Sequence, residues 1–367
     1  MENRMTVNYN NKPCYDILFE KDFDKLAKEI DKLGFKDRKF AIITDTNVSK
    51  LYSEEVKGKL EVLSDKIITI EIPAGEENKN LSEIEKIYEE LIINKFDRHD
   101  LIIALGGGVV GDMAGFTAAT YLRGIAFIQV PTTLLAQTDS SIGGKTGVDL
   151  NGYKNMIGAF YMPRLVYMNI STLNSLSGRQ YASGFAEVMK HGLIKDASFY
   201  TWLVENMYEI DDKDPDVVLE MVYRSCDIKR AVVEKDPTEK GDRALLNFGH
   251  TLGHAIEKAK DFELAHGECV ALGCVAAAFI SWKKEMISMD EYYEIRDMFV
   301  PFNLPISVED IDPDNVIELT KSDKKADGDK IRFILLKKIG KAVIDLTVTE
   351  DEMRAALDEI IYIENND

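Results

Sequence analysis

The first half of the chain alternates short apolar runs with segments whose apolar residues recur every three or four positions. The apolar runs cover residues 39–44, 66–72, 101–105, 126–130 and 164–170. Several are apolar without interruption, which is typical of strands buried on both faces of a sheet. Between them, residues 48–61 and 81–95 show helical spacing, with Ile84, Ile87 and Leu91 on one face. This alternation predicts a doubly wound parallel sheet.

The pattern changes near residue 176. Helical segments follow one another at 179–195, 198–209, 215–235, 244–260 and 267–287, and only 332–338 and 341–346 have the pattern of strands. The expected fold class is therefore α/β: a Rossmann-like doubly wound domain over residues 1–175, followed by a mainly α-helical domain over 176–367. The linker is expected within 171–178, which is rich in Ser, Thr, Asn and Gly.

Composition excludes several classes of protein. With 367 residues, 45% of them hydrophobic, the chain can bury a large core. A net charge of −19 argues against nucleic acid or an anionic membrane as the main partner. No Cys-x-x-Cys pair and no apolar N-terminal signal segment are present, and the longest apolar stretch, 269–282, is too short to span a membrane. We therefore expect a cytoplasmic protein without a disulfide framework.

Two glycine-bearing segments point to anion binding. In LIIALGGGVVGDMAGF, Gly106, Gly107 and Gly108 lie between an expected strand and an expected helix, which favours a nucleotide or pyrophosphate site over a plain tight turn. The spacing differs from G-x-G-x-x-G, and Asp112 could simply complement the helix dipole. The second segment, 139–149, carries Lys145 beside two glycines but lacks the first glycine of a P-loop, so an anionic substrate is a better interpretation than ATP.

Histidines are scarce, and three of the five lie close together in the sequence. His250 and His254 share one helix face, and His266 begins the next expected helix. Two imidazoles and a carboxylate form a typical zinc site with an open position, although an isolated pair at this spacing is more often a surface feature. By spacing alone either Glu187 or His191 could be a further ligand, and a surface pair of Glu187 with Lys190 or with His191 is an equal alternative.

Seven blocks of the sequence, taken in order, resemble the 3-dehydroquinate synthase family. They are GGGVVGDMAGF, YLRG, VPTTLLAQTDSSIGGKTGVD, KNMIGAFYMP, FAEVMKHGLI, RALLNFGHTLGHAIE and HGE. The resemblance runs from about Thr44 to Lys341, and its blocks at 131–160 and 243–268 are highly specific.

This resemblance implies an NAD-dependent enzyme with one divalent metal ion, zinc or cobalt, acting in the shikimate pathway. Such an enzyme converts 3-deoxy-D-arabino-heptulosonate 7-phosphate to 3-dehydroquinate and phosphate. It does so by transient oxidation, β-elimination of phosphate, re-reduction and an intramolecular aldol reaction. The family also implies a homodimer, in which Arg123 reaches the phosphate at the neighbouring subunit's site.

Residue roles follow from the same resemblance. The metal ligands correspond to Glu187, His250 and His266, so the resemblance favours Glu187 over His191 as the further ligand. The substrate contacts correspond to Lys145, Asn155, Lys190, Lys229, Arg243, Asn247 and His254, with either Lys324 or Lys325 as another. The resemblance implies that His254 orients the substrate, because in the family the leaving phosphate takes the proton. The nucleotide contacts correspond to Asp45, Asn47, Glu76, Lys79, Gly107, Gly108, Val109, Asp112, Thr132, Thr133, Asp139, Lys145, Lys154, Thr172 and Ser175. Ala74 departs from the family's usual Asp-Gly-Glu opening.

Three alternatives remain. Another sugar-phosphate cyclase, making an inosose, a valiolone or an amino-dehydroquinate, would share fold and cofactors. Arg243 with Asn247 suits a substrate carboxylate, which disfavours the cyclases of neutral sugar phosphates but leaves the amino-dehydroquinate alternative open. A glycerol dehydrogenase-type enzyme would not need Lys145, Lys154, Asn155 and Arg243. An inactive NAD-binding protein is hard to reconcile with an intact set of Glu187, His250 and His266.

Overall fold

The computed structural model describes residues 3–239, 241–322 and 331–362. The chain divides into two compact units. The first contains residues 1–175 and Lys229–Thr238, and the second contains Leu176–Ile228 and Glu239–Asp367. The segment 229–238 thus groups with the first unit, whereas the sequence placed it in the second. Helix α8 (Pro215–Lys235) begins in the second unit and ends in the first.

The first unit is built on a seven-stranded sheet with the order β1-β2-β9-β6-β5-β3-β4. β1 pairs antiparallel with β2, and the remaining neighbours pair in parallel, which confirms the predicted doubly wound sheet. The strands are β1 (Arg4–Tyr9), β2 (Lys12–Glu20), β3 (Phe40–Asp45), β4 (Ile67–Ile72), β5 (Leu101–Gly106), β6 (Ala126–Pro131) and β9 (Leu165–Asn169).

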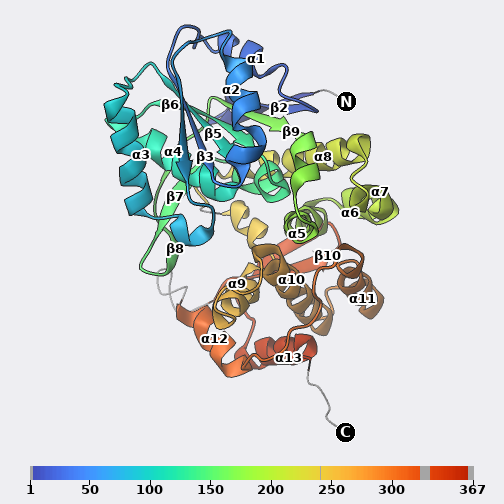
Figure 1. Cartoon of the computed structure of the whole chain (residues 1–367). Helices are drawn as coiled ribbons and strands as arrows, with labels where there is room; N and C mark the ends of the chain where they lie inside the picture. The colour runs from blue at the N-terminus through green and yellow to red at the C-terminus, as the bar shows by residue number, and fades with distance from the viewer. Residues whose placement is uncertain (1–2, 240, 323–330, 363–367) are drawn as a thin grey trace. The chain divides into compact units, whose positions relative to one another are not determined.

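Helices cover both faces of this sheet because successive strand residues point to opposite sides. Phe40 and Ile42 pack in one buried cluster with residues of α1 (Leu26–Lys32) and α2 (Glu54–Leu60). Ala41 and Ile43 pack in another cluster with residues of α3 (Leu81–Ile93) and α4 (Gly108–Thr120), as can be followed in Figure 1. A continuous apolar run is therefore required in the central strands.

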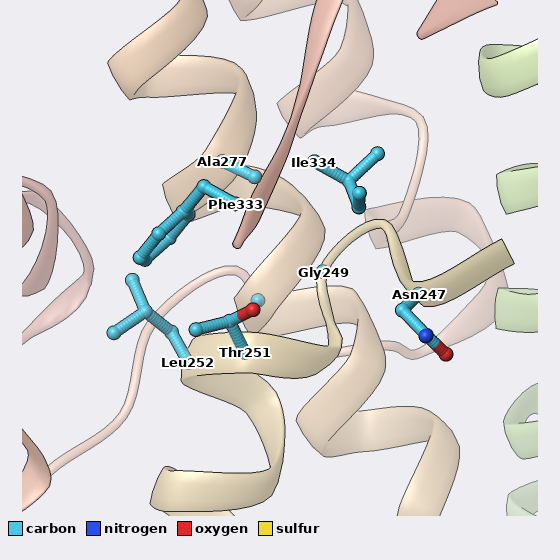
Figure 2. A pocket seen from close by; sticks show the side chains of 8 residues that line it. Asn247, Gly249, Thr251, Leu252, Ala277, Phe333 and Ile334 are labelled. Carbon is cyan, nitrogen blue, oxygen red and sulfur yellow. The ribbon is translucent and has the colours of Figure 1, made fainter. Parts of the chain in front are cut away.

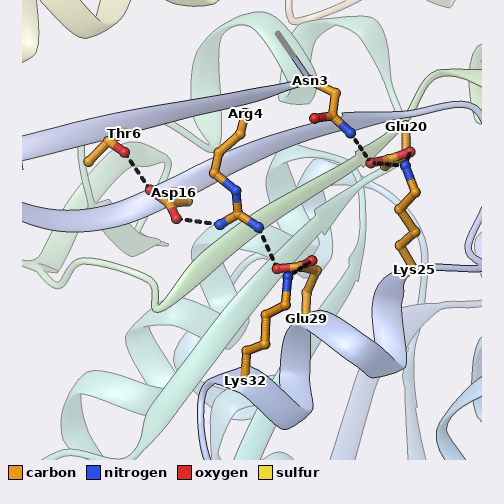
Figure 3. Close-up of polar contacts among 8 residues, drawn as sticks. All are labelled: Asn3, Arg4, Thr6, Asp16, Glu20, Lys25, Glu29 and Lys32. Carbon is orange, nitrogen blue, oxygen red and sulfur yellow. Dashed lines mark hydrogen bonds and ion pairs between the residues drawn. The ribbon is translucent and has the colours of Figure 1, made fainter.

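The N-terminal hairpin β1–β2 was not predicted, because its residues contain no long apolar run and include Pro13. Charged side chains connect it to α1, as Figure 3 shows. Arg4 donates to Asp16 on the neighbouring strand (2.5 Å) and to Glu29 of α1 (2.6 Å). Burial opposes the charge on Glu29, but Lys32 and Arg4 outweigh it and lower the pKa of this carboxyl. Further contacts join Asn3 and Lys25 to Glu20.

A second hairpin, β7 (Lys145–Leu150) and β8 (Tyr153–Phe160), forms a separate two-stranded sheet. The sequence suggested a glycine loop over 139–149. The second half of that prediction is wrong, because the residues from Lys145 onward form strand β7. Gly147 and Gly158 face each other in the pairing, and a Cβ on Gly158 would lie 2.3 Å from the Thr146 carbonyl oxygen. Short helical turns complete the unit: η1 (Ser49–Ser53), η2 (Glu76–Asn78), η3 (Tyr121–Arg123), η4 (Ala136–Ser140) and η5 (Ile170–Ser175).

The second unit is mainly helical, as predicted, with one antiparallel pair, β10 (Phe333–Lys338) and β11 (Lys341–Asp345). Its remaining elements are α5 (Gly178–Lys195), α6 (Ala197–Glu205), α7 (Met207–Asp211), η6 (Asp242–Asn247), α9 (His250–Ala259), α10 (His266–Lys283), α11 (Met289–Asp297), η7 (Val300–Phe302), α12 (Pro313–Ser322) and α13 (Glu350–Ile360).

The single helix expected over 244–260 is wrong, because the chain breaks at Gly249. This residue has φ 79°, a left-handed conformation that favours glycine. A Cβ at Gly249 would lie 2.8 Å from the Cys274 backbone nitrogen. The break therefore lets α9 start against α10. Within the described residues, no helix is long and apolar enough to cross a membrane.

Candidate active site

The parallel sheet of the first unit has a topological switch point between β3 and β5. From β3 the chain passes to β4 on one side and then returns to β5 on the other. Ligands of open α/β sheets bind outside the carboxyl ends of the strands at such a point. Asp45 ends β3 and Gly106 ends β5. Two of the segments predicted to bind NAD thus lie at the expected position.

The glycine turn after β5 is closely packed. Gly107 caps the start of α4, whose first backbone N–H groups are suited to bind a pyrophosphate. A Cβ on Gly106 would lie 2.6 Å from Val110 Cγ2, and one on Gly108 would lie 3.0 Å from Ser140 Oγ. Side chains at these positions would displace the helix start, so the turn requires small residues.

Four more predicted nucleotide residues also follow carboxyl ends of parallel strands, whereas Asp139 lies in η4 and Lys145 and Lys154 lie on the β7–β8 hairpin. Thr132 and Thr133 follow β6, and the Thr132 N–H donates to the Gly106 carbonyl (3.0 Å). Thr172 and Ser175 follow β9, and Tyr52 donates to Ser175 Oγ (2.8 Å). Most of the predicted nucleotide contacts are spread over more than a hundred positions of the sequence, yet they follow the carboxyl ends of the parallel strands and so lie at one edge of the sheet. They are Asp45, Asn47, Glu76, Lys79, Gly107, Gly108, Val109, Asp112, Thr132, Thr133, Thr172 and Ser175.

Lys79 and Asp112 contact each other directly. The Lys79 ammonium lies 2.7 Å from Asp112 and donates to Asn155 Oδ1 (2.6 Å). Burial opposes the charge on Lys79, but Asp112 and Glu76 outweigh it and raise its pKa. Burial raises the pKa of Asp112, although Lys79 acts against it. Lys79 thus joins the segment after β4, the helix after the glycine turn and the β7–β8 hairpin.

Asp45 and Asp139 also have protein partners. Asp45 accepts the backbone N–H of Asn47 (2.8 Å) and fixes the turn after β3. Lys229 donates to Asp139 Oδ1 (2.5 Å) and to its carbonyl oxygen (2.6 Å). A ligand contact by Lys229 or Asp139 would therefore form beside an existing ion pair.

Three predicted substrate or cofactor residues lie on the β7–β8 hairpin. Lys145 is exposed at the start of β7, Lys154 is half-buried in β8, and Asn155 is exposed beside it. Asn155 has φ 55°, and its backbone N–H donates to Asp149 (2.7 Å). Asp149 was not predicted, since a single carboxylate in a hairpin gives no sequence signal. Arg123 is exposed with φ 63° in the turn after α4.

In the second unit, three side chains from three helices converge on one point. Glu187 of α5 lies with its Oε1 3.3 Å from His266 Nε2 of α10 and 3.4 Å from His250 Nε2 of α9. One ligand atom from each of the three lies within 4.8 Å of the others. The carboxylate is almost fully buried, at 1% exposure. A buried carboxylate between two imidazoles is a donor set that fits a divalent ion such as zinc.

The charges in this cluster favour the metal-binding protonation states of Glu187 and His250 but not that of His266. Burial would raise the pKa of Glu187, but Lys190 and both imidazoles outweigh it and hold the pKa well below its usual range. Burial, with Lys190, lowers the pKa of His250 well below its usual value. Burial would lower the pKa of His266, but the hydrogen bond with Glu187 outweighs burial and raises the pKa of this imidazole. Lys190 forms an ion pair with Glu187, so the pair that the sequence left open is buried rather than a surface pair.

Further hydrogen bonds orient the rings. His250 Nδ1 lies 3.1 Å from the Phe248 carbonyl oxygen, which leaves Nε2 unprotonated toward Glu187 when the ring is neutral. His191, the alternative ligand, lies with Nδ1 2.8 Å from Ser225 Oγ. His254 lies beside His250 and His266, with ring centroids 4.9 and 5.9 Å away.

Sequence reasoning missed Glu257 in this region. It is buried one turn after His254, and His254, Glu257 and His266 also place ligand atoms within 4.8 Å of one another. The spacing of His250, His254 and Glu257 along one helix face was the available signal.

The remaining predicted substrate residues of this unit lie in η6. Arg243 is buried, and the exposed Asn247 donates to Glu239 (3.1 Å). Figure 2 shows Asn247 beside residues of α9, α10 and β10 that line a small surface hollow. The hollow encloses no space that a ligand could fill. Lys324 and Lys325 lie outside the described residues.

Comparisons with known proteins identify the family of this chain. The family model for the 3-dehydroquinate synthase N-terminal domain matches residues 69–183, and that for the C-terminal domain matches 184–326. The 3-dehydroquinate synthase of Acetivibrio thermocellus is 45% identical over 350 residues, which are 95% of this chain and 97% of that protein.

Two solved structures share the fold over 97% of this chain and 99% of theirs, each at 25% identity. One is 2-epi-5-epi-valiolone synthase from Streptomyces hygroscopicus subsp. jinggangensis 5008 with NAD+ and Zn2+ bound (TM-score 0.88). The other is 2-deoxy-scyllo-inosose synthase complexed with carbaglucose-6-phosphate, NAD+ and Co2+ (TM-score 0.81). These likenesses confirm the predicted fold class. With both family models matching and this level of identity along almost its whole length, the chain belongs to the 3-dehydroquinate synthase family.

Proposed function

We propose that this chain is an NAD- and metal-dependent lyase that converts 3-deoxy-D-arabino-heptulosonate 7-phosphate to 3-dehydroquinate and phosphate. The observation that carries the proposal is the buried Glu187 carboxylate held between the imidazoles of His250 and His266, in a chain of this family. Each unit then supplies one cofactor site: the switch point of the parallel sheet for NAD, and the Glu187–His250–His266 cluster for one zinc or cobalt ion.

When bound, NAD supplies a reversible hydride acceptor, and the divalent ion favours loss of the proton from the hydroxyl being oxidised. Glu187, His250 and His266 hold the ion and leave a coordination position for a substrate oxygen. Lys190 places a positive charge beside Glu187, where it favours the anionic form of an oxygen that loses its proton. His254 is placed to orient the substrate hydroxyls.

The cationic and amide side chains account for an anionic substrate. Lys145, Lys154 and Lys229, with Asn155, suit a phosphate and stabilise it as it leaves. Arg243 and Asn247 suit a carboxylate, because a guanidinium binds one through two parallel hydrogen bonds. A site for a substrate carboxylate favours the heptulosonate phosphate over the neutral sugar phosphates on which other cyclases act.

One assay tests this function. Purified protein supplied with NAD and zinc is expected to release phosphate from the heptulosonate phosphate without net accumulation of NADH, because the oxidation is reversed. Glucose 6-phosphate and sedoheptulose 7-phosphate serve as matched substrates that lack the carboxylate. Faster phosphate release from either would indicate another cyclase, steady formation of NADH would indicate a dehydrogenase, and no release from any would refute the proposal.

We also propose that the enzyme is a cytoplasmic homodimer in which Arg123 acts at the partner's site. Arg123 is exposed, as are Leu122 beside it and Tyr153, Met156 and Phe160 on β8. Mixing inactive Arg123→Ala and Lys145→Ala subunits tests this. If Arg123 acts across the dimer, one site in each mixed dimer is complete, and about a quarter of the activity returns at equal mixing. No recovery from exchanging subunits would show that Arg123 acts within its own subunit.

A further inference from the structure

The proposed function uses His266 of the His-Gly-Glu segment that begins α10 but gives no role to Gly267 or Glu268. On α5, Arg179, Ser183 and Glu187 follow one another at intervals of four residues, so they lie on one helix face. The first residues of α10 lie against this face. The segment therefore contacts α5 at three successive levels.

The three contacts pair residues in ascending order on α5 with residues in descending order on α10. Arg179 donates from Nε to Glu268 Oε1 (2.7 Å) and from its terminal nitrogen to Glu268 Oε2 (2.6 Å). The Gly267 N–H donates to Ser183 Oγ (2.9 Å). His266 Nε2 lies 3.3 Å from Glu187 Oε1. The last contact joins two of the expected metal ligands. The first two contacts fix the distance between the helices that carry these ligands.

The middle contact requires glycine. A Cβ on Gly267 would lie 2.1 Å from the Ser183 carbonyl oxygen and 2.3 Å from the Ser183 Cα, both of them backbone atoms. Any larger residue would push α10 away from α5. His266 is the adjacent residue, so the displacement would reach its imidazole directly.

The outer contact also fixes the chain that leads into His266. Glu268 Oε2 accepts the Ala265 N–H (2.7 Å), and Arg179 donates to the Glu263 carbonyl oxygen (3.0 Å). Arg179 thus contacts the chain on both sides of His266. A bidentate guanidinium–carboxylate pair has a defined geometry that a single ammonium lacks.

We propose that Arg179, Ser183, Gly267 and Glu268 are positioning residues that set the separation of Glu187 and His266 and thereby the affinity for the divalent ion. The inference rests on the metal site of the proposed function. None of the four is required to touch the ion or the substrate.

The zinc affinity of the metal-free protein, measured by competition with a chromophoric chelator, tests this role. Arg179→Met keeps an unbranched apolar stem and removes both hydrogen bonds to Glu268 and the one to the Glu263 carbonyl oxygen. We expect zinc to bind about tenfold more weakly, the range found when partners of metal ligands are removed. Arg179→Lys retains the charge and is expected to recover part of the affinity. Ser183→Ala removes the acceptor of the middle contact and is expected to weaken binding in the same direction.

The chain offers a matched control. Lys284 lies 3.1 Å from Glu352, which accepts the Thr349 N–H (2.8 Å) in the first turn of α13, just as Glu268 accepts that of Ala265. Lys284→Met is expected to lower the melting temperature of the metal-free protein by as much as Arg179→Met does, and to leave the zinc affinity within twofold of wild type.

Equal zinc affinity in Arg179→Met and Lys284→Met would overturn the proposal, because Arg179 would then only stabilise the fold. Gly267→Ala gives an independent check: unchanged zinc affinity in a folded Gly267→Ala protein would also overturn it. The measurement needs no substrate. If the variants lose zinc affinity as expected but the zinc-loaded wild-type protein releases no phosphate, the proposed function is refuted and this inference stands.

Discussion

Replacing Lys79 by Met should destabilise the first unit because it leaves the Asp112 carboxylate without its main partner. Lys79 is 4% exposed and contacts Asp112 at 2.7 Å, Glu76 at 3.7 Å and Asn155 at 2.6 Å. Removing one member of a buried ion pair costs about 3–5 kcal/mol. Glu76 is 40% exposed, so its contact contributes little, and Asp112 retains 18% exposure.

The expected loss is therefore at the lower end, about 3 kcal/mol, or roughly a hundredfold in the unfolding equilibrium. Lys86→Met is the matched control, because the Lys86–Glu83 pair at 2.6 Å has a lysine that is 66% exposed. Exposed pairs contribute about 0–1 kcal/mol, so this variant should remain within roughly 0.5 kcal/mol of wild type. The double variant Lys79→Met with Asp112→Asn should recover most of the loss, since the unpaired charge is then absent.

The assay must report on the first unit. Trp202 and Trp282 both lie in the second unit, so tryptophan fluorescence would follow the wrong part of the chain. Hydrogen exchange of peptides from β5 and α4, measured with increasing urea, gives the free energy of unfolding of the first unit. If Lys79→Met and Lys86→Met differ by less than 0.5 kcal/mol, the reasoning from burial and pairing is wrong.

Three further predictions concern the two cofactor sites. Removing the metal with a chelator, or replacing His266 by Ala, should abolish phosphate release. The NAD affinity measured by titration should stay within about twofold of that of the zinc-loaded wild type, since each proposed site lies in its own unit. Zinc affinity should rise with pH while His266 loses its proton, by about tenfold per unit below the raised pKa of this group, because zinc binds the unprotonated ring. A pH-independent chelator competition would contradict this. Gly108→Ala places a Cβ 3.0 Å from Ser140 Oγ and should weaken NAD binding about tenfold while zinc affinity, measured in parallel, is unchanged.

The order of strands and helices was largely predictable because it depends on local periodicity. The runs at 39–44, 101–105 and 126–130 are so uniformly apolar that only a strand covered on both faces accounts for them. The prediction failed where local signals were weak or were overridden. The hairpin β1–β2 has mixed polarity, and the helix expected over 244–260 breaks at Gly249 because α10 lies too close for a side chain there.

The sequence by itself indicated the kinds of residue that are expected to carry the chemistry: a glycine turn after a strand, and histidines near one another in a chain with five histidines in all. Spacing could not choose between Glu187 and His191, and the family resemblance, rather than any local pattern, favoured Glu187. Both lie on α5, and only packing shows that His191 contacts Ser225 whereas Glu187 contacts His250 and His266.

The tertiary structure alone decided which of these groups act together. The buried Lys79 contacts Asp112, Glu257 lies beside His254, and Arg179 forms hydrogen bonds with Glu268 at the start of α10. These contacts join residues that are far apart in the sequence and are set by how closely two helices or a strand and a hairpin approach. Periodicity reports the environment of a residue along its own element, but the identity of its neighbour depends on packing between elements.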